Sequence, residues 1–422
     1  MTTVVVGGGL AGLVAARHLA EAGHDVTVYE REPTVGGRVR SVHENGFIFD
    51  RGFQVLFTAY PAVSTELDTE SLDLRPFKPG ATLARPGERK TLADPFGDIS
   101  AALESLVNRD VTFADKLRVL QLRRSLIRTP VSEILETDET TIETYLRECG
   151  FSERFLDNFA RPFYGGITLD RSLSTSELVF RYTFKMLSQG VTAVPAAGMG
   201  QIPTQLATRA REAGATIEVE TPVSAVSTDG TGVTVELGGE TISADAAVVA
   251  TDPKSARELT ECEAIPTESR RCVTQYFSLP SDQQLPTGKR LLLNVGSDRP
   301  NQVAPLSTVA PEYAPDEMHL LSATFLGDQP QTDAELASEV RDTLASWYPA
   351  NDFSELELLR TNRIQFAQFV QPPGFRATRP AVNAPERPVY LAGDYTEWSS
   401  IQGAMESGKR AATELNRALS VR

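Results

Sequence analysis

The sequence predicts an α/β protein with two domains, one built on a parallel sheet flanked by helices and the other a mixture of sheet and helices. Three observations predict this fold. A glycine-rich turn joins an apolar strand to a helix at the N-terminus, and near the C-terminus a second strand ends in Gly393-Asp394 before another helix. The length of 422 residues also exceeds what one hydrophobic core usually organises.

The N-terminal strand, turn and helix have the pattern of a dinucleotide fingerprint. The apolar run Val4–Val6 is the strand, and the residues expected at the phosphates are Gly7, Gly9, Leu10, Ala11 and Gly12. The glycines permit a tight turn, close approach of a pyrophosphate and close packing of helix on sheet. Glu30 ends the second strand and can accept hydrogen bonds from ribose hydroxyls. This pattern predicts a Rossmann-type domain, and by itself it suits NAD as well as FAD.

The segment after Glu30 distinguishes between the two cofactors. Residues 31–38, which end in Gly36-Gly37-Arg38, follow the acidic strand end, and this combination resembles the flavin-containing amine oxidase superfamily. That superfamily also holds protoporphyrinogen oxidases and phytoene desaturases, and the resemblance implies FAD. Paired glycines let the backbone pass close to an extended cofactor, and an arginine offers a planar fork to its phosphate or flavin region. We expect Arg31, Gly37 and Arg38 to contact FAD.

The far end of the chain is similar to the same superfamily. Residues 388–394 have the pattern of a buried strand ending in Gly-Asp, and residues 399–408 open a helix. The resemblance implies that the Gly-Asp pair binds the ribityl and pyrophosphate region and that the helix start faces the flavin pyrimidine. A helix N-terminus there stabilises the negative charge of a reduced flavin. The further residues implied at FAD are Gly52, Phe53, Val223, Gly393, Asp394, Ile401, Gln402 and Ala404.

The resemblance implies a discontinuous FAD-binding domain, Rossmann-type and GR2-like, made of residues 1–60, 195–260 and 385–422. Residues 61–194 and 261–384 would then form an α+β substrate-binding domain with a mixed sheet and helices. Two internal segments support this division. Pro195–Pro203 resembles the P-x-G-G-M-G segment of the superfamily, and Asn158–Ile167 resembles a substrate-domain segment of protoporphyrinogen oxidases and carotene desaturases.

Local patterns predict the elements inside these segments. From about Ile99 to Gly190 apolar residues recur at three-to-four spacing, as at Leu103, Leu106 and Val107, which predicts helices. Beyond Pro195 the pattern changes to that of strands. The predicted strands are Thr216–Val219, Val223–Val226, Val233–Glu236, Ala246–Ala250, Thr274–Phe277, Leu291–Val295 and His319–Phe325, with a hairpin turn at Asp229-Gly230.

Composition argues against several functional classes. The formal net charge is −15, from 56 acidic and 41 basic residues, which opposes nucleic-acid binding. An acidic surface poor in lysine is typical of a halophilic protein, and an ordinary cytoplasmic enzyme of moderate acidity is the alternative. The three cysteines, Cys149, Cys262 and Cys272, have no C-x-x-C spacing, so neither a disulfide framework nor a metal site is expected. The first strand begins within three residues and no 18-residue apolar run occurs, which predicts a cytoplasmic protein.

The resemblance implies an FAD-dependent oxidoreductase that removes hydride from a carbon of a hydrophobic substrate to flavin N5. Carotenoid or isoprenoid desaturation and porphyrinogen-type oxidation are the leading reactions, with oxygen or quinone as the electron acceptor. Positioning and water exclusion dominate such chemistry, so the catalytic side chain stays unknown. No cysteine follows Cys272 to tether a flavin, so the FAD is expected to be non-covalent.

Three alternatives stay open at this point. The first is a flavin amine oxidase, although Lys289, the only lysine between Val273 and Tyr390, has the setting of a loop. The second is a non-redox FAD enzyme like UDP-galactopyranose mutase. The third is a binding protein like the Rab GDP-dissociation inhibitors, which the intact glycine and Gly-Asp motifs argue against.

Candidates for the substrate site are mostly aromatic. They are Phe163, Tyr164, Arg181, Phe366 and Trp398, although core packing is the commoner role of such aromatic residues. Arg161 and Arg181 could bind a substrate carboxylate, although arginines more often form surface ion pairs. Basic residues from Lys116 to Arg128 interleave with leucines, a pattern compatible with peripheral contact to an anionic membrane and more often found in a solvated helix.

Overall fold

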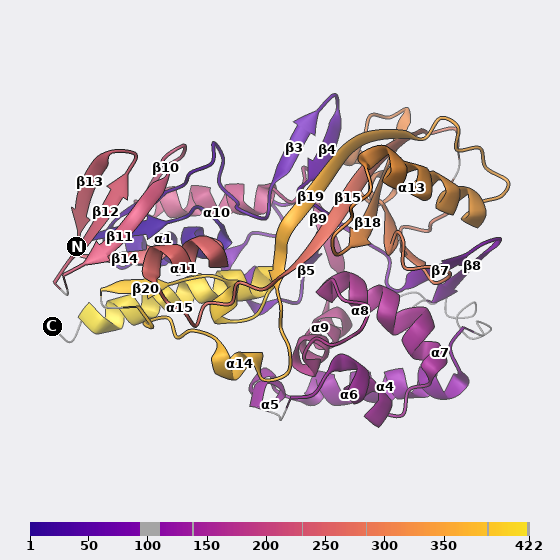
Figure 1. Ribbon diagram of the computed structural model, residues 1–422, viewed down its shortest axis with the longest axis horizontal. Coiled ribbons are helices and arrows are strands. Elements are labelled where there is room, and N and C mark those ends of the chain that lie inside the picture. The colour runs from indigo at the N-terminus through magenta and orange to yellow at the C-terminus, as the bar shows by residue number, and fades with distance from the viewer. Residues whose placement is uncertain (93–109, 137–138, 230, 284, 386–387, 420–422) are drawn as a thin grey trace.

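The computed structural model describes residues 1–92, 110–136, 139–229, 231–283, 285–385 and 388–419. Two domains lie side by side in Figure 1, and both chain ends belong to the same one. That first domain contains the parallel sheet, and the second contains long antiparallel strands and a group of helices. The expected helix residues Leu103, Leu106 and Val107 and the expected turn residue Gly230 lie outside the described residues.

The first domain is built on a five-stranded parallel sheet. Its strands are β1 (Thr2–Val6), β2 (Asp25–Tyr29), β10 (Thr216–Glu218), β14 (Ala246–Val249) and β20 (Val389–Leu391). They lie in the order β10-β2-β1-β14-β20, so the sheet takes strands from three separated stretches of the chain. Val4–Val6 is buried because β1 lies in the middle of the sheet, where both faces are covered.

Helices cover one face of this sheet, and a smaller sheet covers the other. The helices are α1 (Leu10–Glu21), α10 (Gln201–Glu212) and α15 (Ile401–Leu419), which pack on Val5, Val28 and Val248. On the opposite face lie β11 (Val223–Thr228), β12 (Val233–Leu237), β13 (Glu240–Ala244) and α11 (Pro253–Thr260). A Cβ on Gly408 of α15 would lie 2.2 Å from the oxygen of Ala11 in α1, so the two ends of the chain approach closely.

The second domain contains a seven-stranded mixed sheet. Its strands are β7 (Ala81–Arg85), β8 (Glu88–Leu92), β15 (Ser269–Pro280), β16 (Leu291–Asn294), β17 (Gln302–Pro305), β18 (Met318–Leu326) and β19 (Glu357–Phe369). Their order is β19-β15-β18-β17-β16-β7-β8, and only β16 and β7 pair in parallel among them. Helix α13 (Asp333–Trp347) packs on one face, through Trp347 among others. The other face turns toward the first domain, where Tyr276 of β15 donates to the oxygen of Asp50.

A group of helices completes the second domain (Figure 1). They are α4 (Phe113–Arg128), α5 (Val131–Glu136), α6 (Ile142–Glu148), α7 (Glu153–Phe155), the π-helical turn η1 (Leu156–Ala160), α8 (Arg161–Thr168) and α9 (Glu177–Gln189). Their shared core is rich in aromatic rings, including Phe155, Tyr164 and Phe180. Thr112 and Asp115 form a capping box that fixes the start of α4. The last helix of the group, α9, ends at Gln189, one residue before the predicted end at Gly190.

Short strands and helical pieces make up the remaining elements of the described residues. The strands are β3 (Ser41–Glu44), β4 (Phe47–Asp50), β5 (Leu56–Phe57), β6 (Leu74–Pro76) and β9 (Thr192–Pro195). The helical pieces are α2 (Pro61–Glu66), α12 (Leu306–Val309), η2 (Pro311–Tyr313), α14 (Phe375–Thr378) and η3 (Asp394–Thr396). Across the part of the chain that the structure describes, none of the helices is both long and apolar enough to span a membrane.

Candidate active site

The glycine turn after β1 has the geometry that a dinucleotide fingerprint needs. Gly7 has a φ of +104°, which disfavours other residues. A Cβ on Gly12 would lie 2.0 Å from the oxygen of Gly7, so only glycine lets α1 begin this close to the strand. A Cβ on Gly9 would meet no protein atom within 4 Å, because its open side faces a cavity. The first turn of α1, which carries no acidic side chain, thus leaves room and positive potential for an anion.

Glu30 is held beside this turn by backbone groups. Its Oε2 accepts a hydrogen bond of 2.7 Å from the nitrogen of Gly8, and its Oε1 accepts one of 2.9 Å from the nitrogen of Glu32. The side chain lines the cavity. Each carboxylate oxygen has two acceptor positions, so Glu30 can still accept hydrogen bonds from a ribose.

An ion pair joins the second and the last of the predicted cofactor motifs. The nitrogen of Gly36 donates to the oxygen of Gly8, which places the loop that carries Arg38 against the glycine turn. Nη2 of Arg38 lies 2.6 Å from Oδ1 of Asp394, and Ser399 donates to Oδ2 of the same carboxylate at 2.9 Å. Burial opposes the charge of Arg38, but Asp394 outweighs burial and raises the pKa of Arg38. Arg38 therefore stays charged at the cavity wall.

The start of α15 contributes two of its three predicted residues to the cavity. Ile401 and Ala404 line it, close to Gly393. Gln402 is buried outside the lining, where its Oε1 accepts a hydrogen bond of 2.8 Å from the nitrogen of Ala62 at the start of α2. Gln402 thus fixes α15 to α2, a contact that the local sequence pattern does not reveal.

These elements line one end of a continuous cavity of about 1310 Å³. We call the end beside the glycine turn, Arg38 and the start of α15 the cofactor arm. The predicted cofactor residues that line the cavity are Gly7, Gly9, Leu10, Ala11, Glu30, Arg31, Gly37, Arg38, Gly52, Phe53, Val223, Gly393, Asp394, Ile401 and Ala404. Gly12 lies behind the turn. Because pockets for one drug-sized ligand occupy roughly 300–1,000 Å³, this cavity has room for a dinucleotide and a second molecule.

The rest of the cavity, which we call the aromatic arm, runs among the helices of the second domain. Its rings are Phe113, Phe151, Phe155, Phe159, Phe163, Tyr164, Phe180 and Phe184. Phe366 on β19 also lines the cavity. The rings of Phe159 and Phe163 stack with centroids 5.1 Å apart. Sequence patterns pointed to Phe163, Tyr164 and Phe366 but missed the contribution of α4, because only the fold brings α4 beside α8 and α9.

Two predicted substrate residues lie outside the cavity lining. Arg181 lies over the ring of Tyr145, with its guanidinium carbon 5.7 Å from the ring centre. Trp398 packs edge-on against Tyr182, with ring centroids 4.9 Å apart. Trp398 thus has the packing role that was the alternative for the aromatic candidates, whereas Arg181 lies on a ring and not in the surface ion pair that was the alternative for it.

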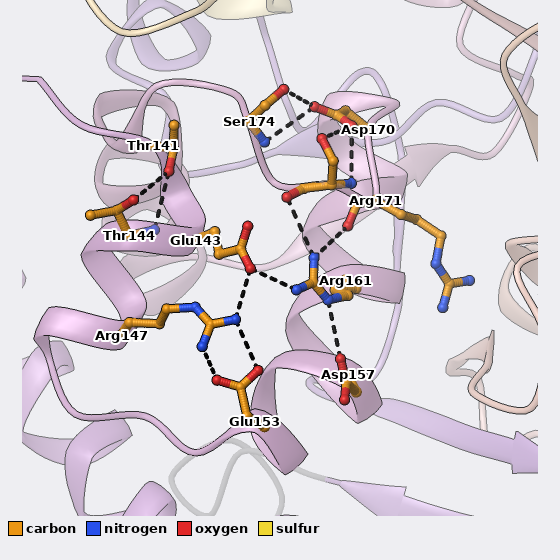
Figure 2. Close-up of polar contacts among 11 residues, drawn as sticks. Thr141, Glu143, Thr144, Arg147, Glu153, Asp157, Arg161, Asp170, Arg171 and Ser174 are labelled. Atoms are coloured by element: carbon orange, nitrogen blue, oxygen red, sulfur yellow. Dashed lines mark hydrogen bonds and ion pairs between the residues drawn. The ribbon is translucent and has the colours of Figure 1, made fainter.

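Arg161, the other candidate for a substrate carboxylate, is engaged by acidic residues of the protein itself. Figure 2 shows it between Glu143 and Asp157, at 2.8 Å and 3.1 Å. Arg147 bonds to the same Glu143 and to Glu153, so the ion pairs connect α6, α7 and α8. Arg161 does not line the cavity. It stabilises the helical group and is not a substrate ligand of this cavity.

A buried carboxyl group lies directly behind the loop that carries Gly52. Asp50 accepts hydrogen bonds from the hydroxyl of Ser41 at 2.5 Å, the hydroxyl of Tyr313 at 2.9 Å and the nitrogen of Met199 at 2.9 Å. Burial, only partly offset by these bonds, raises the pKa of Asp50 to about 6. Sequence patterns gave no sign of this cluster, because its members come from the β3–β4 hairpin and from two distant parts of the chain, at Met199 and Tyr313.

The fold and the two-armed cavity define a dinucleotide-binding protein with room for an organic substrate. Residues 10–416 match the family described as flavin containing amine oxidoreductase, and the chain belongs to this family. The protein is therefore an FAD-dependent oxidoreductase, as predicted, and non-covalent binding of the flavin is typical of this family. The open space at Gly9, the acceptor at Glu30 and the size of the cavity fit this cofactor.

Known proteins are similar to this chain, one over nearly its whole length and another over part of it. A 15-cis-phytoene desaturase of Narcissus pseudonarcissus is 24% identical over 458 residues, which cover 98% of this chain and 79% of that protein. Protoporphyrinogen oxidase 2 of Arabidopsis thaliana is 30% identical over 164 residues, which cover 38% of this chain and 31% of that protein.

Solved structures share the fold. An oxidoreductase from Methanosarcina mazei aligns with a TM-score of 0.76 at 19% identity, covering 98% of this chain and 100% of that one. The cyclohexylamine oxidase from Brevibacterium oxydans aligns with a TM-score of 0.68 at 18% identity, covering 99% of both chains. The family match confirms the predicted membership of the amine oxidase superfamily. These structures show the α/β fold.

Proposed function

We propose that this protein dehydrogenates a hydrophobic organic substrate, by carotenoid or isoprenoid desaturation or by porphyrinogen-type oxidation. The observation that carries the proposal is the continuity of the cavity. One arm is lined by the glycine turn and Glu30, and the other is lined by a run of aromatic rings. Large apolar rings in a deep pocket suit a large apolar ligand. The phytoene desaturase and protoporphyrinogen oxidase relatives are named for substrates of this kind.

The proposed FAD site follows the cofactor arm. We assign the phosphates to the amides of Gly9, Leu10 and Ala11, and the ribose to Glu30. Arg38, Asp394 and the start of α15 would complete the site, with Gly52, Phe53 and Val223 at its edges. The domain that holds FAD would then comprise residues 1–60, 195–260 and 385–422, and residues 61–194 and 261–384 would hold the substrate.

The protein's part in the reaction is positioning and exclusion of water. Bound FAD supplies a two-electron acceptor for a hydride leaving a substrate carbon. The aromatic arm removes water from the substrate and limits its orientations, which lowers the barrier by making the approach of the two reactants intramolecular. Burial raises the pKa of Tyr164 in this arm, so its hydroxyl stays neutral. Burial also raises the pKa of Cys272, to about 12, so its thiol stays neutral as well.

Peripheral contact with a membrane is a further part of the proposal. Phe113 and Leu117 on α4 are exposed and also line the cavity, so the aromatic arm reaches the surface there. Basic residues share this helix, from Lys116 to Arg128. An apolar substrate could enter from an anionic bilayer at this point. Co-sedimentation with anionic and neutral vesicles at several salt concentrations tests the idea, which fails if no vesicle pellets the protein.

The experiment for the reaction is anaerobic mixing of the FAD-loaded protein with a panel of carotenes, porphyrinogens and amines. Loss of the oxidised flavin absorption band with a carotene or porphyrinogen is expected. If only amines bleach the flavin, the proposal is wrong and the protein is an amine oxidase. Readmitting either oxygen or a quinone then shows which of the two restores the band, and so identifies the acceptor. Repeating the assay at molar salt tests the proposed halophilic character.

A further inference from the structure

A row of polar residues crosses the face of the seven-stranded sheet that turns toward the first domain. Strand pairing puts Asn362 of β19 opposite Thr274 of β15, Thr274 opposite Thr324 of β18, and Thr324 opposite Gln302 of β17. Directly opposed residues stand on the same face of a sheet. Asn362, Thr274, Thr324 and Gln302 therefore form one line, which we call the polar row.

Three members of the polar row line the cavity. Thr274 is 0% exposed, and Thr324 and Gln302 are each 3% exposed. Within the described residues, the hydroxyls of Thr274 and Thr324 have no hydrogen-bond partner. The side-chain oxygen of Gln302 accepts a hydrogen bond from the side-chain nitrogen of Asn301. Within the described residues, the side-chain nitrogen of Gln302 donates to no protein acceptor. The row thus places unpartnered polar side chains in the cavity lining.

The polar row lies where the cofactor arm meets the aromatic arm. The hydroxyl of Thr274 would lie 3.8 Å from a Cβ on Gly52, a cofactor-arm residue. The neighbouring strand β19 reaches the cofactor arm as well, since the oxygen of its Ala367 accepts a hydrogen bond of 3.2 Å from Arg38. Asn362 is already engaged, because it donates to the oxygen of Asp50 at 3.0 Å.

An unpartnered hydroxyl is informative here because of where it lies. Ser322 is two residues before Thr324 on the same face of β18, and its buried hydroxyl is also without a partner among the described residues, but Ser322 does not line the cavity. Burial of a polar group without a partner is costly, and a bound ligand can remove that cost only where it has access. Thr274 and Thr324 belong to the cavity lining, and Ser322 does not.

The chemistry of the row selects an uncharged ligand group. Arg363, the cation nearest in sequence to Asn362, is held by Asp333 at 2.7 Å and by backbone oxygens. Asp115, the carboxylate in the lining beside the aromatic rings, is saturated by Thr112 and Ser152. Hydroxyls donate and accept, and the amide nitrogen donates, so the row matches a hydroxyl or carbonyl oxygen.

We propose that the polar row binds an uncharged oxygen group, a hydroxyl or a carbonyl, carried by an otherwise apolar substrate. This inference rests on the proposed function, because it assigns the substrate to the aromatic arm. It narrows that function by favouring oxygen-bearing molecules over plain hydrocarbons.

The test compares binding of two probes to the FAD-loaded protein. Phytol and phytane share a C20 branched skeleton, and differ in the hydroxyl and one double bond. Thermal unfolding in the presence of each probe, together with perturbation of the flavin spectrum, gives their dissociation constants. Wild-type protein is expected to bind phytol about tenfold more tightly, equivalent to about 1.4 kcal/mol.

The variants assign this preference to residues. Thr274→Val with Thr324→Val keeps the side-chain shape and removes both hydroxyls, so the preference should fall to about twofold or less while phytane affinity stays constant. Ser322→Ala is the matched control and should keep the full preference. Each single threonine variant is measured as well, so that the result does not depend on the double variant folding.

Equal affinity of the wild type for both probes would overturn the proposal, as would a preference that survives loss of both hydroxyls. The oxidised flavin band is recorded in each sample. A protein that holds FAD and shows no probe preference contradicts the polar row alone. A protein that cannot hold FAD contradicts the proposed function, while the thermal shifts still report on the row.

Discussion

At the scale of single residues, the glycines of the N-terminal turn have two separate physical roles. Gly12 is required by the protein itself, because a Cβ there would collide with the oxygen of Gly7. Gly9 has no such neighbour, and its open side faces the cofactor arm. The two roles can therefore be separated by experiment.

We expect Gly12→Ala to lower the free energy of unfolding of the apoprotein by roughly 1–3 kcal/mol, since the strand and helix must move apart. Gly9→Ala should leave the apoprotein stability within about 0.5 kcal/mol and weaken FAD binding, because the added methyl group occupies space that the pyrophosphate needs. Urea unfolding of the apoproteins and FAD titration followed by flavin fluorescence measure both effects. If Gly9→Ala binds FAD as tightly as the wild type, the assignment of this turn to the pyrophosphate is wrong.

The buried carboxyl group of Asp50 makes the free energy of unfolding depend on pH. Its pKa in the folded protein is about 6, above the ordinary value of 3.8, so the folded state holds this proton more strongly than the unfolded state. The contribution of Asp50 to stability is therefore complete below about pH 4 and is lost as the pH rises through 6. The difference between these two pKa values corresponds to roughly 3 kcal/mol in the free energy of unfolding, as an upper bound.

Asp50→Asn should remove this dependence. The difference in free energy of unfolding between wild type and variant, measured in urea at pH 4.5 and 7.5, should shift in favour of the variant at the higher pH. Asn can still accept from Met199 and donate to Tyr313, so the comparison is isosteric. A difference that does not change with pH would show that Asp50 titrates normally.

At the scale of elements, the ion pairs around Arg161 connect helices and do not serve the cavity (Figure 2). Arg161→Gln should cost no more than about 1 kcal/mol of stability, because partly exposed ion pairs contribute little. It should leave FAD binding and the rate of anaerobic flavin bleaching unchanged. A large loss of bleaching rate with full FAD content would instead place Arg161 in substrate binding.

The elements differ in how well the sequence predicted them. The glycine turn, Glu30 and the strand that ends in Gly393 are local patterns, and they line the cofactor arm as the motifs implied. Strand β19 was missed because polar side chains such as Arg360 and Gln365 interrupt its alternation, although pairing with β15 holds it in the sheet. The aromatic arm could be predicted only in part, because α4 joins it through tertiary packing.

At the scale of the whole molecule, the cofactor arm is assembled from distant parts of the chain. Arg38 bonds to Asp394, and α1 meets α15 at Gly408 (Figure 1). A ligand that contacts all of these segments stabilises the folded state by mass action. The polar row joins residues from four strands of one sheet, and the Asp50 cluster joins residues from β3, β4, η2 and the turn before α10, which explains why no sequence motif revealed them.

FAD at 100 times its dissociation constant should therefore raise the free energy of unfolding by about 2.7 kcal/mol. Urea unfolding with and without FAD, with riboflavin as a control lacking the dinucleotide, measures this increase. An equal increase with riboflavin would mean that the phosphate and ribose groups of the arm contribute nothing.

The central claim is that one cavity holds FAD in its cofactor arm and an apolar substrate in its aromatic arm. The most direct measurement is difference absorption spectroscopy of the oxidised, FAD-loaded protein during titration with a hydrophobic ligand such as phytol. The account predicts a saturable shift of the flavin band that parallels the ligand-induced thermal stabilisation, because the two arms meet. Thermal stabilisation by the ligand with an unchanged flavin spectrum would contradict it.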